Sequence, residues 1–377
     1  MEMSKGIFPL RGAVQHYAWG GKQFIPSLLS IDNVEQEPFA EYWLGVHHRG
    51  PAQIKKNDKW VNLDTLTSLP FLLKILDVQQ MLSIQSHPTK EQAEIGFNRE
   101  NNKEIPLDAP NRVFKDDNHK PELMVALSDF WLLHGFRSLD QIRQICKDIP
   151  PFQILLPHIT DISSFYAYLM YLDEDSCDSI FEELSAFLQT VDTNNKNEPH
   201  YWAAKALQQY GNDRGIFSIY FYNLVHLNNG EAIYQEAGIP HAYLQGQNVE
   251  IMANSDNVFR AGLTPKHVDI DLLLSHLDFT SVVPKIIQPQ KEGSSLFVYK
   301  SPAKEFEVHY IDIASSDHLS LVSTSPECYF CLTGEVTILT EEQEFTCSMG
   351  ESFFVEEGVS YALSSIADCS LFRAIVP

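Results

Sequence analysis

A metal-binding pattern occurs in residues 82–88, where Gln85 and His87 lie two positions apart. The preceding apolar run, residues 71–76, is typical of a strand. A strand through residues 82–88 would turn Ser83, Gln85 and His87 to one face. An amide oxygen and an imidazole nitrogen on one face can hold a single metal ion. Such a triplet also arises by chance, and a solvated strand end is the simpler interpretation of an isolated one.

Two further segments offer ligands of the same kind. Residues 117–123 place Lys120 and Glu122 just before a hydrophobic run that is typical of a strand. His241 follows a Gly-Ile-Pro sequence and stands at the start of another predicted strand. The rim of a β-barrel suits a metal ligand. Alone, however, residues 117–123 are more commonly a polar loop, and a lone histidine at such a rim is more often structural or exposed to solvent.

Residues 250–266 combine the apolar spacing of a strand with many functional side chains. Such groups need partners if they are buried, so a plain core strand would not carry them. They are Glu250, Asp256, Asn257, Arg260 and Lys266.

These segments resemble, in the same order, those of the type I phosphomannose isomerases of the cupin superfamily. Residues 15–21 resemble the family's Y-x-W-G signature, and residues 40–47 resemble its A-E-x-W-x-G-x-H segment. Residues 87–97 resemble H-P-x-K-x-x-A-E-x-G-F, and residues 252–266 nearly reproduce the family's most specific signature. The C-terminal third of the chain resembles the family only as a second cupin sandwich.

The resemblance implies one Zn²⁺ ion per chain, held by Gln85, His87, Glu122 and His241. This set of nitrogen and oxygen donors leaves room for water or substrate, as catalytic zinc sites do. It would also accept Co²⁺, Mn²⁺ or Fe²⁺. The implied reaction interconverts mannose 6-phosphate and fructose 6-phosphate by proton transfer through an enediol.

An enediol intermediate requires stabilisation of negative charge on oxygen and a grip on the phosphate. Arg260 is expected to stabilise the enediolate, because its guanidinium stays cationic. The candidates for substrate binding are Ser83 and Lys266 at the phosphate, Lys74 and Lys120 near the sugar oxygens, and Trp19.

The reaction also needs a base, and the sequence leaves this assignment open. Glu250 is the first candidate and His47 the second, followed by Lys120 and Asp256. The choice depends on which group lies within about 3 Å of the hydrogens on C1 and C2.

The chain departs from the family pattern in loops near these residues. His48 stands where a proline commonly follows, Gln235 and Glu236 replace an apolar residue and a proline, and Asn228-Asn229 replaces a proline-containing pair. None of these changes affects an implied metal ligand. They alter loop stiffness near the site.

The patterning predicts a mainly β fold with two cupin-like jelly-roll β-sandwich domains and an α-helical insertion. Residues 1–137 with 213–282 are expected to form a discontinuous catalytic cupin domain. Residues 138–212 show helical spacing with serines at N-cap positions and form the insertion. Residues 283–377 return to short strands and form the C-terminal cupin-like domain, which has His309 and His318 but no metal motif. We expect it to serve packing or stability.

The composition, with 44% hydrophobic and 20% charged residues, is that of a globular protein. No apolar run approaches the ~18–20 residues of a membrane span, and the first ten residues lack a signal-peptide core, which favours the cytoplasm. The net charge of −23 argues against nucleic acid and anionic membranes as partners. A phosphate substrate would therefore need a local group of cations. We expect a monomer or a weak homo-oligomer.

The six cysteines are scattered and do not form a disulfide framework. Cys328 and Cys331 spell C-x-x-C, but on the predicted strand they point to opposite faces, so we expect buried core cysteines. Two other function classes share the ligand set. One is an Fe²⁺-dependent cupin oxygenase, which the lysine and arginine cluster disfavours, and the other is a non-catalytic sugar-phosphate-binding protein.

Overall fold

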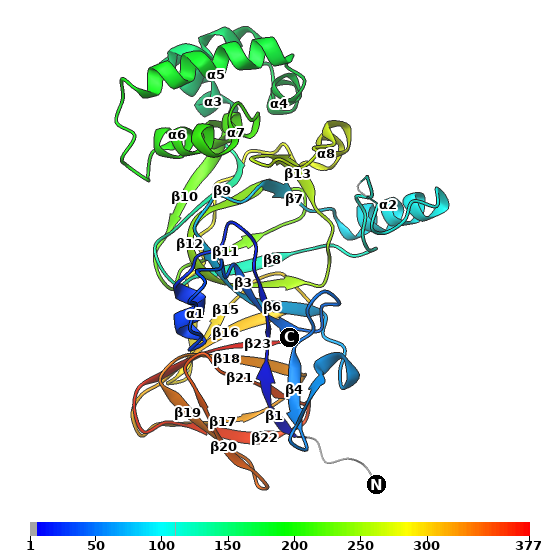
Figure 1. Ribbon diagram of the computed structural model, residues 1–377, viewed down its shortest axis with the longest axis vertical. Helices are drawn as coiled ribbons and strands as arrows, with labels where there is room; N and C mark the ends of the chain where they lie inside the picture. Colours follow the sequence, from blue (N-terminus) through cyan, green and yellow to red (C-terminus); the bar gives the residue numbers. More distant parts are fainter. Residues whose placement is uncertain (1–5, 110) are drawn as a thin grey trace.

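The computed structural model describes residues 6–109 and 111–377. A helical region lies at one end of the molecule, a β-sandwich in the middle and a second β-sandwich at the other end (Figure 1). The predicted mainly β fold with two sandwiches and a group of helices is confirmed. Among the described residues, no helix is long and apolar enough to cross a membrane.

The middle sandwich is organised by β12 (His241–Ala253), which pairs with strands of both layers. Its first residues pair with β7 and β9, and its last residues pair with β6 and β8. The two halves meet at Gly246, where φ is +133° and an added Cβ would lie 2.5 Å from the Phe130 ring. Only glycine fits this backbone without strain. The other strands are β2 (Ala13–Gln15), β3 (Glu41–Gly45), β6 (Phe71–Val78), β7 (Ile84–Ser86), β8 (Glu122–Ala126), β9 (Phe130–Phe136), β10 (Tyr222–Leu227), β11 (Ala232–Gln235) and β13 (Phe259–Gly262).

Alternation along the central strands places polar residues inside this sandwich. Every residue of β6 is buried, because one face lines the interior and the other packs against the second sandwich. Lys74 of β6 lies opposite Glu250 of β12, and both face the interior. Their neighbours face the second sandwich and share a hydrophobic cluster with Phe330, Phe354 and Phe372. These neighbours are Leu73, Ile75, Leu123, Val125, Val249 and Ile251.

The helical region packs around a core of aromatic and aliphatic side chains that continues into the middle sandwich through β9, β12 and β13. Its helices are α3 (Leu139–Asp148), η2 (Pro150–His158), α4 (Ile162–Met170), α5 (Glu174–Leu188), α6 (Pro199–Tyr210) and α7 (Gly215–Phe221). Ser138 caps α3 through a capping box with Gln141, as a serine at that position predicts. Asp161 and Asp173, not the nearby serines, cap α4 and α5. The other helices lie elsewhere: α1 (Phe24–Leu28), η1 (Leu63–Thr65), α2 (Lys90–Asn102) and α8 (Ile270–His276).

The second sandwich contains strands from both ends of the chain. Its larger sheet has the order β14-β15-β16-β23-β18-β21-β1-β4-β5, and its smaller sheet has the order β17-β22-β19-β20. The C-terminal strands are β14 (Gln290–Glu292), β15 (Leu296–Tyr299), β16 (Glu307–Ile313), β17 (His318–Val322), β18 (Glu327–Thr333), β19 (Glu335–Leu339), β20 (Glu344–Ser348), β21 (Ser352–Val355), β22 (Ser360–Ser364) and β23 (Cys369–Ile375). The N-terminal strands are β1 (Ile7–Arg11), β4 (Gln53–Lys56) and β5 (Lys59–Asn62).

This arrangement departs from the expected domain division in two ways. The strands β1, β4 and β5 belong to the sheet of the second sandwich, since β1 pairs with β21. Helix also continues beyond residue 212, because α7 runs directly into β10. The C-x-x-C cysteines are buried and free, with Cys328 and Cys331 in different hydrophobic clusters on opposite faces of β18. The prediction of core cysteines is confirmed.

Candidate metal centre and substrate site

Three ligand-type side chains meet inside the middle sandwich. His87, Glu122 and His241 are at most 1% exposed. Nε2 of His87 lies 3.5 Å from Oε1 of Glu122, and Nε2 of His241 lies 3.3 Å from Oε2 of Glu122. Within the described residues, both Nε2 atoms and Oε2 of Glu122 have no hydrogen-bond partner. Buried polar atoms are rarely left unpaired, so the donor set fits a metal ion.

The backbone fixes both imidazoles in the state that a metal requires. Nδ1–H of His87 donates to the carbonyl of Asn257 at 2.7 Å, and Nδ1–H of His241 donates to the carbonyl of Ile239 at 3.0 Å. A carbonyl can only accept, so the proton is on Nδ1 and the Nε2 lone pair faces the site. Burial also lowers the pKa of His87 to about 4, which keeps its ring neutral.

Gln85 reaches the same region through strand register. It lies opposite His241 in the β7–β12 pair and opposite Arg260 in the β7–β13 pair. The structure therefore brings His87, Glu122 and His241 together, with Gln85 opposite His241 in strand register.

Lys120 lies beside the candidate metal ligands. Its Nζ lies 3.1 Å from Oε1 of Glu122, and the lysine is 8% exposed. Burial acts to raise the pKa of Glu122, but the Lys120 ammonium outweighs it and holds that pKa well below its usual range. Glu122 is therefore an ionised carboxylate, the form that binds a cation.

A second charged group lies in the same interior, around Lys74. Its Nζ lies 2.9 Å from Oε1 of Glu250 and 3.6 Å from Oε2 of Glu41. Burial disfavours the ammonium, but the carboxylates of Glu250 and Glu41 outweigh it and raise the pKa of Lys74. The hydroxyl of Tyr243 donates to Oε2 of Glu250 at 2.8 Å, and the indole of Trp43 donates to Glu41. Both oxygens of Glu250 are thus engaged.

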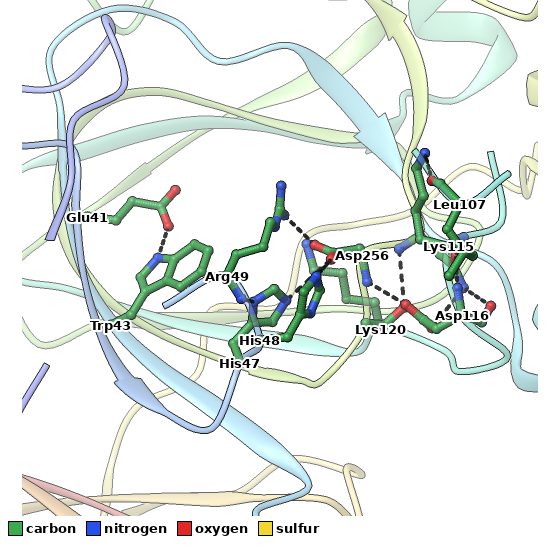
Figure 2. Close-up of polar contacts among 12 residues, drawn as sticks. Glu41, Trp43, His47, His48, Arg49, Leu107, Lys115, Asp116, Lys120 and Asp256 are labelled. Atoms are coloured by element: carbon green, nitrogen blue, oxygen red, sulfur yellow. Dashed lines mark hydrogen bonds and ion pairs between the residues drawn. The ribbon is translucent and has the colours of Figure 1, made fainter. Parts of the chain in front are cut away.

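Asp256 forms a third group with His47 and Arg49 (Figure 2). The Arg49 guanidinium lies 2.5 Å from Oδ1, and Nε2 of His47 lies 3.4 Å from Oδ2. Burial acts to raise the pKa of Asp256, but the His47 hydrogen bond and Arg49 hold it below its usual range. The backbone N–H of Arg49 donates to Nδ1 of His47, so Nε2 carries the proton and donates to Asp256. Nε2 of His48 lies 4.0 Å from Oδ2 of Asp256, so this cluster also has residues of the metal-ligand type. The proton on Nε2 of His47 and the guanidinium of Arg49 favour an ion pair with Asp256 over a bound metal ion.

The remaining predicted residues surround these groups. Arg260 is half-buried on β13, and burial lowers its pKa. Burial, followed by the charges of Arg260 and Arg49, also lowers the pKa of the exposed Lys266. Three cations therefore share one region of an acidic chain, as a phosphate substrate would require. Ser83 is half-buried just before β7, and Trp19 is half-buried and stacks on Tyr17.

Two residues that shape the site are not among those that the sequence indicates. One is Arg49, although it lies only two residues after His47, the last residue of the A-E-x-W-x-G-x-H segment. Tyr243 could have been found from its place two residues after His241 on the same predicted strand. Asn257, by contrast, is among the functional side chains that the sequence indicates. It is fully buried, and its amide binds backbone and side-chain atoms around Asp116, which fixes the loop before Lys120.

The fold and the site together define a cupin-like protein with a candidate metal centre inside its middle sandwich. Residues 7–139 match the family model described as phosphomannose isomerase type I, catalytic domain. The mannose-6-phosphate isomerase of Salmonella typhimurium is 35% identical, over 92% of this chain and 94% of that protein. The human mannose-6-phosphate isomerase is 34% identical, over 98% of each chain. The chain therefore belongs to the type I phosphomannose isomerase family.

Solved structures support the same assignment. The Salmonella typhimurium mannose 6-phosphate isomerase bound to fructose 6-phosphate and zinc has a TM-score of 0.88 and 33% identity, covering 98% of this chain and 99% of that one. A holo, zinc-bound mannose 6-phosphate isomerase matches equally well, with a TM-score of 0.88.

Proposed function

We propose that this protein is a zinc-dependent isomerase that interconverts mannose 6-phosphate and fructose 6-phosphate. The observation that carries the proposal is the set of three unpaired ligand atoms on His87, Glu122 and His241, next to Gln85. Membership of the type I phosphomannose isomerase family indicates these two substrates, and the donor set suits zinc. When bound there, the metal would polarise the hydroxyl and carbonyl oxygens of the sugar.

The residues around the ligands can divide the remaining tasks. Arg260 is a fixed cation for the negative charge that develops on the enediolate oxygens. Lys120 is the proton-transfer candidate nearest to the metal ligands, at 3.1 Å from Glu122. Lys266 and Ser83 are proposed to bind the phosphate, with Arg49 contributing to the local positive field.

The other candidates for the base are engaged elsewhere. Glu250 accepts from both Lys74 and Tyr243. Neither ring nitrogen of His47 has a free lone pair, since one accepts from Arg49 and the other donates to Asp256. We therefore place Lys120 before Glu250 and His47 for proton transfer, with Asp256 orienting His47 and Arg49. Lys74 and Trp19 are proposed to contact the sugar.

The decisive experiment measures conversion of mannose 6-phosphate to fructose 6-phosphate by purified protein. The protein is assayed as isolated, after chelation and after Zn²⁺ is restored. We expect activity that chelation removes and zinc returns. A folded, zinc-loaded sample without activity would refute the isomerase, and oxygen consumption with anaerobically loaded Fe²⁺ would favour a cupin oxygenase instead.

We further propose that the protein works in the cytoplasm as a monomer or weak homo-oligomer. The described structure contains all six cysteines, each one free, which suits a reducing compartment. Both groups of potential metal ligands found among the described residues lie in the middle sandwich. This supports a C-terminal sandwich without a metal.

A further inference from the structure

A contact between the two sandwiches reaches the loop that carries Lys120. Nε2 of His119 lies 2.6 Å from Oε1 of Glu305, which precedes β16 in the C-terminal part of the chain. The two side chains are 30% and 22% exposed. The hydrogen bond is thus only partly exposed to water.

The segment that carries Glu305 is held firmly against the middle sandwich. The adjacent Phe306 is 1% exposed and belongs to the same hydrophobic cluster as Leu123 and Val125 of β8. The backbone N–H of Lys304 donates to Oε2 of Glu305 at 3.1 Å, which leaves Oε1 for His119. The carboxylate therefore has a fixed position relative to β8, the strand that begins with Glu122.

His119 and Lys120 are consecutive residues of the loop before β8, and their side chains contact different groups. His119 points toward Glu305, whereas Lys120 points inward to Glu122. Pro121 restricts the backbone of Lys120. A change in the position of His119 is therefore transmitted to the Lys120 ammonium.

The preceding residue of the loop is anchored from the other side. The carbonyl of Asn118 accepts from Nδ2 of Asn257 at 2.9 Å and from Oγ of Ser255 at 3.2 Å. These bonds come from the middle sandwich itself and do not involve Glu305. His119 is thus the point at which the second sandwich acts on this loop.

We propose that Glu305 is a positioning residue for the isomerase site: through His119 it holds Lys120 against Glu122. The C-terminal sandwich thereby contributes to catalysis, beyond the packing role expected from the sequence. This inference rests on the proposed role of Lys120 in the reaction.

The test compares Glu305→Ala with Glu307→Ala in the zinc-loaded full chain. Glu307 is a matched control, because it lies in the same sandwich and also contacts a histidine, His309, at 2.7 Å. We expect Glu305→Ala to lower kcat about tenfold with KM changed less than twofold, since small misplacements of a reacting group are costly. Glu305→Gln keeps an oxygen that accepts from His119 and should recover most of the rate. Glu307→Ala should leave kcat and KM unchanged.

A double-variant cycle separates positioning from a general loss of stability. Once Glu305 is absent, His119→Ala should slow the reaction little further, whereas independent effects would multiply. Wild-type kcat in folded Glu305→Ala, or an equal loss in Glu307→Ala, overturns the inference while the isomerase function stands. An inactive zinc-loaded wild type overturns both, and normal kcat in Lys120→Ala removes the role on which the inference rests.

Discussion

At the scale of single residues, the contacts of Glu250 favour a structural role over proton transfer. It is 4% exposed and ion-paired with the buried Lys74 at 2.9 Å. We predict that Glu250→Gln destabilises the protein by about 3 kcal/mol, because it removes one partner of a buried pair. We also predict a KM raised about tenfold with a smaller change in kcat, since Lys74 loses its fixed position. Kinetics and urea unfolding measure both effects.

The matched control is Glu41→Gln, at the more distant of the two carboxylates near Lys74, 3.6 Å away. It should show the same pattern with smaller effects. A fall of kcat by a thousandfold or more in Glu250→Gln alone would instead assign proton transfer to Glu250.

His134 should make stability depend on pH. Burial lowers its pKa to about 4, whereas an unfolded histidine has a pKa of about 6.5. As pH falls below 6.5, the unfolded chain takes up a proton that the folded chain excludes, so stability is lost. Between pH 7 and pH 5 the wild type should lose about 2 kcal/mol more than His134→Asn. Urea unfolding of the metal-free proteins measures this difference, and parallel pH profiles for the two proteins would contradict it.

At the scale of elements, β12 places His241 at one end and Glu250 toward the other, so its bend at Gly246 sets their relative position. A Cβ there would lie 2.5 Å from Phe130 and 2.7 Å from the carbonyl of Asp129. Gly246→Ala should lower the free energy of unfolding by about 3 kcal/mol and weaken zinc binding, because it combines backbone strain with a steric clash.

Gly230→Ala is the control: its φ is also positive, at +86°, but nothing lies within 4 Å of the added Cβ. It should cost only about 1 kcal/mol. Equal losses, measured by urea unfolding, would show that the contact with Phe130 is unimportant.

The same elements show how far sequence reasoning reaches. The cap at Ser138 and the opposite faces of Cys328 and Cys331 depend on local geometry, and local patterns predicted them. The pairing of β1 with β21 joins segments far apart in the chain, which no local pattern specifies. The Glu305 contact with His119 depends on the same long-range docking. The contacts of the base candidates Glu250 and His47 likewise depend on how β6, β12 and the loop of Asp256 pack together, which the sequence does not specify.

At the scale of the whole molecule, metal binding and folding should be coupled throughout the chain. The ligand atoms of His87, Glu122 and His241 are buried and unpaired, so a metal that binds only the folded state satisfies them. The two sandwiches share the hydrophobic cluster that includes Leu123 and Phe330, and β1 joins the second sheet. We therefore predict one cooperative thermal transition and not two.

Zn²⁺ at a hundred times its Kd should add about 2.7 kcal/mol to the free energy of unfolding, which raises the melting temperature by about 3 °C for a chain of 377 residues. Calorimetry with and without zinc measures the shift, and a variant combining His87→Ala with His241→Ala should show none. Two transitions, of which zinc moves only one, would mean that the sandwiches unfold independently. The C-terminal sandwich would then be too weakly coupled to hold the Lys120 loop in place.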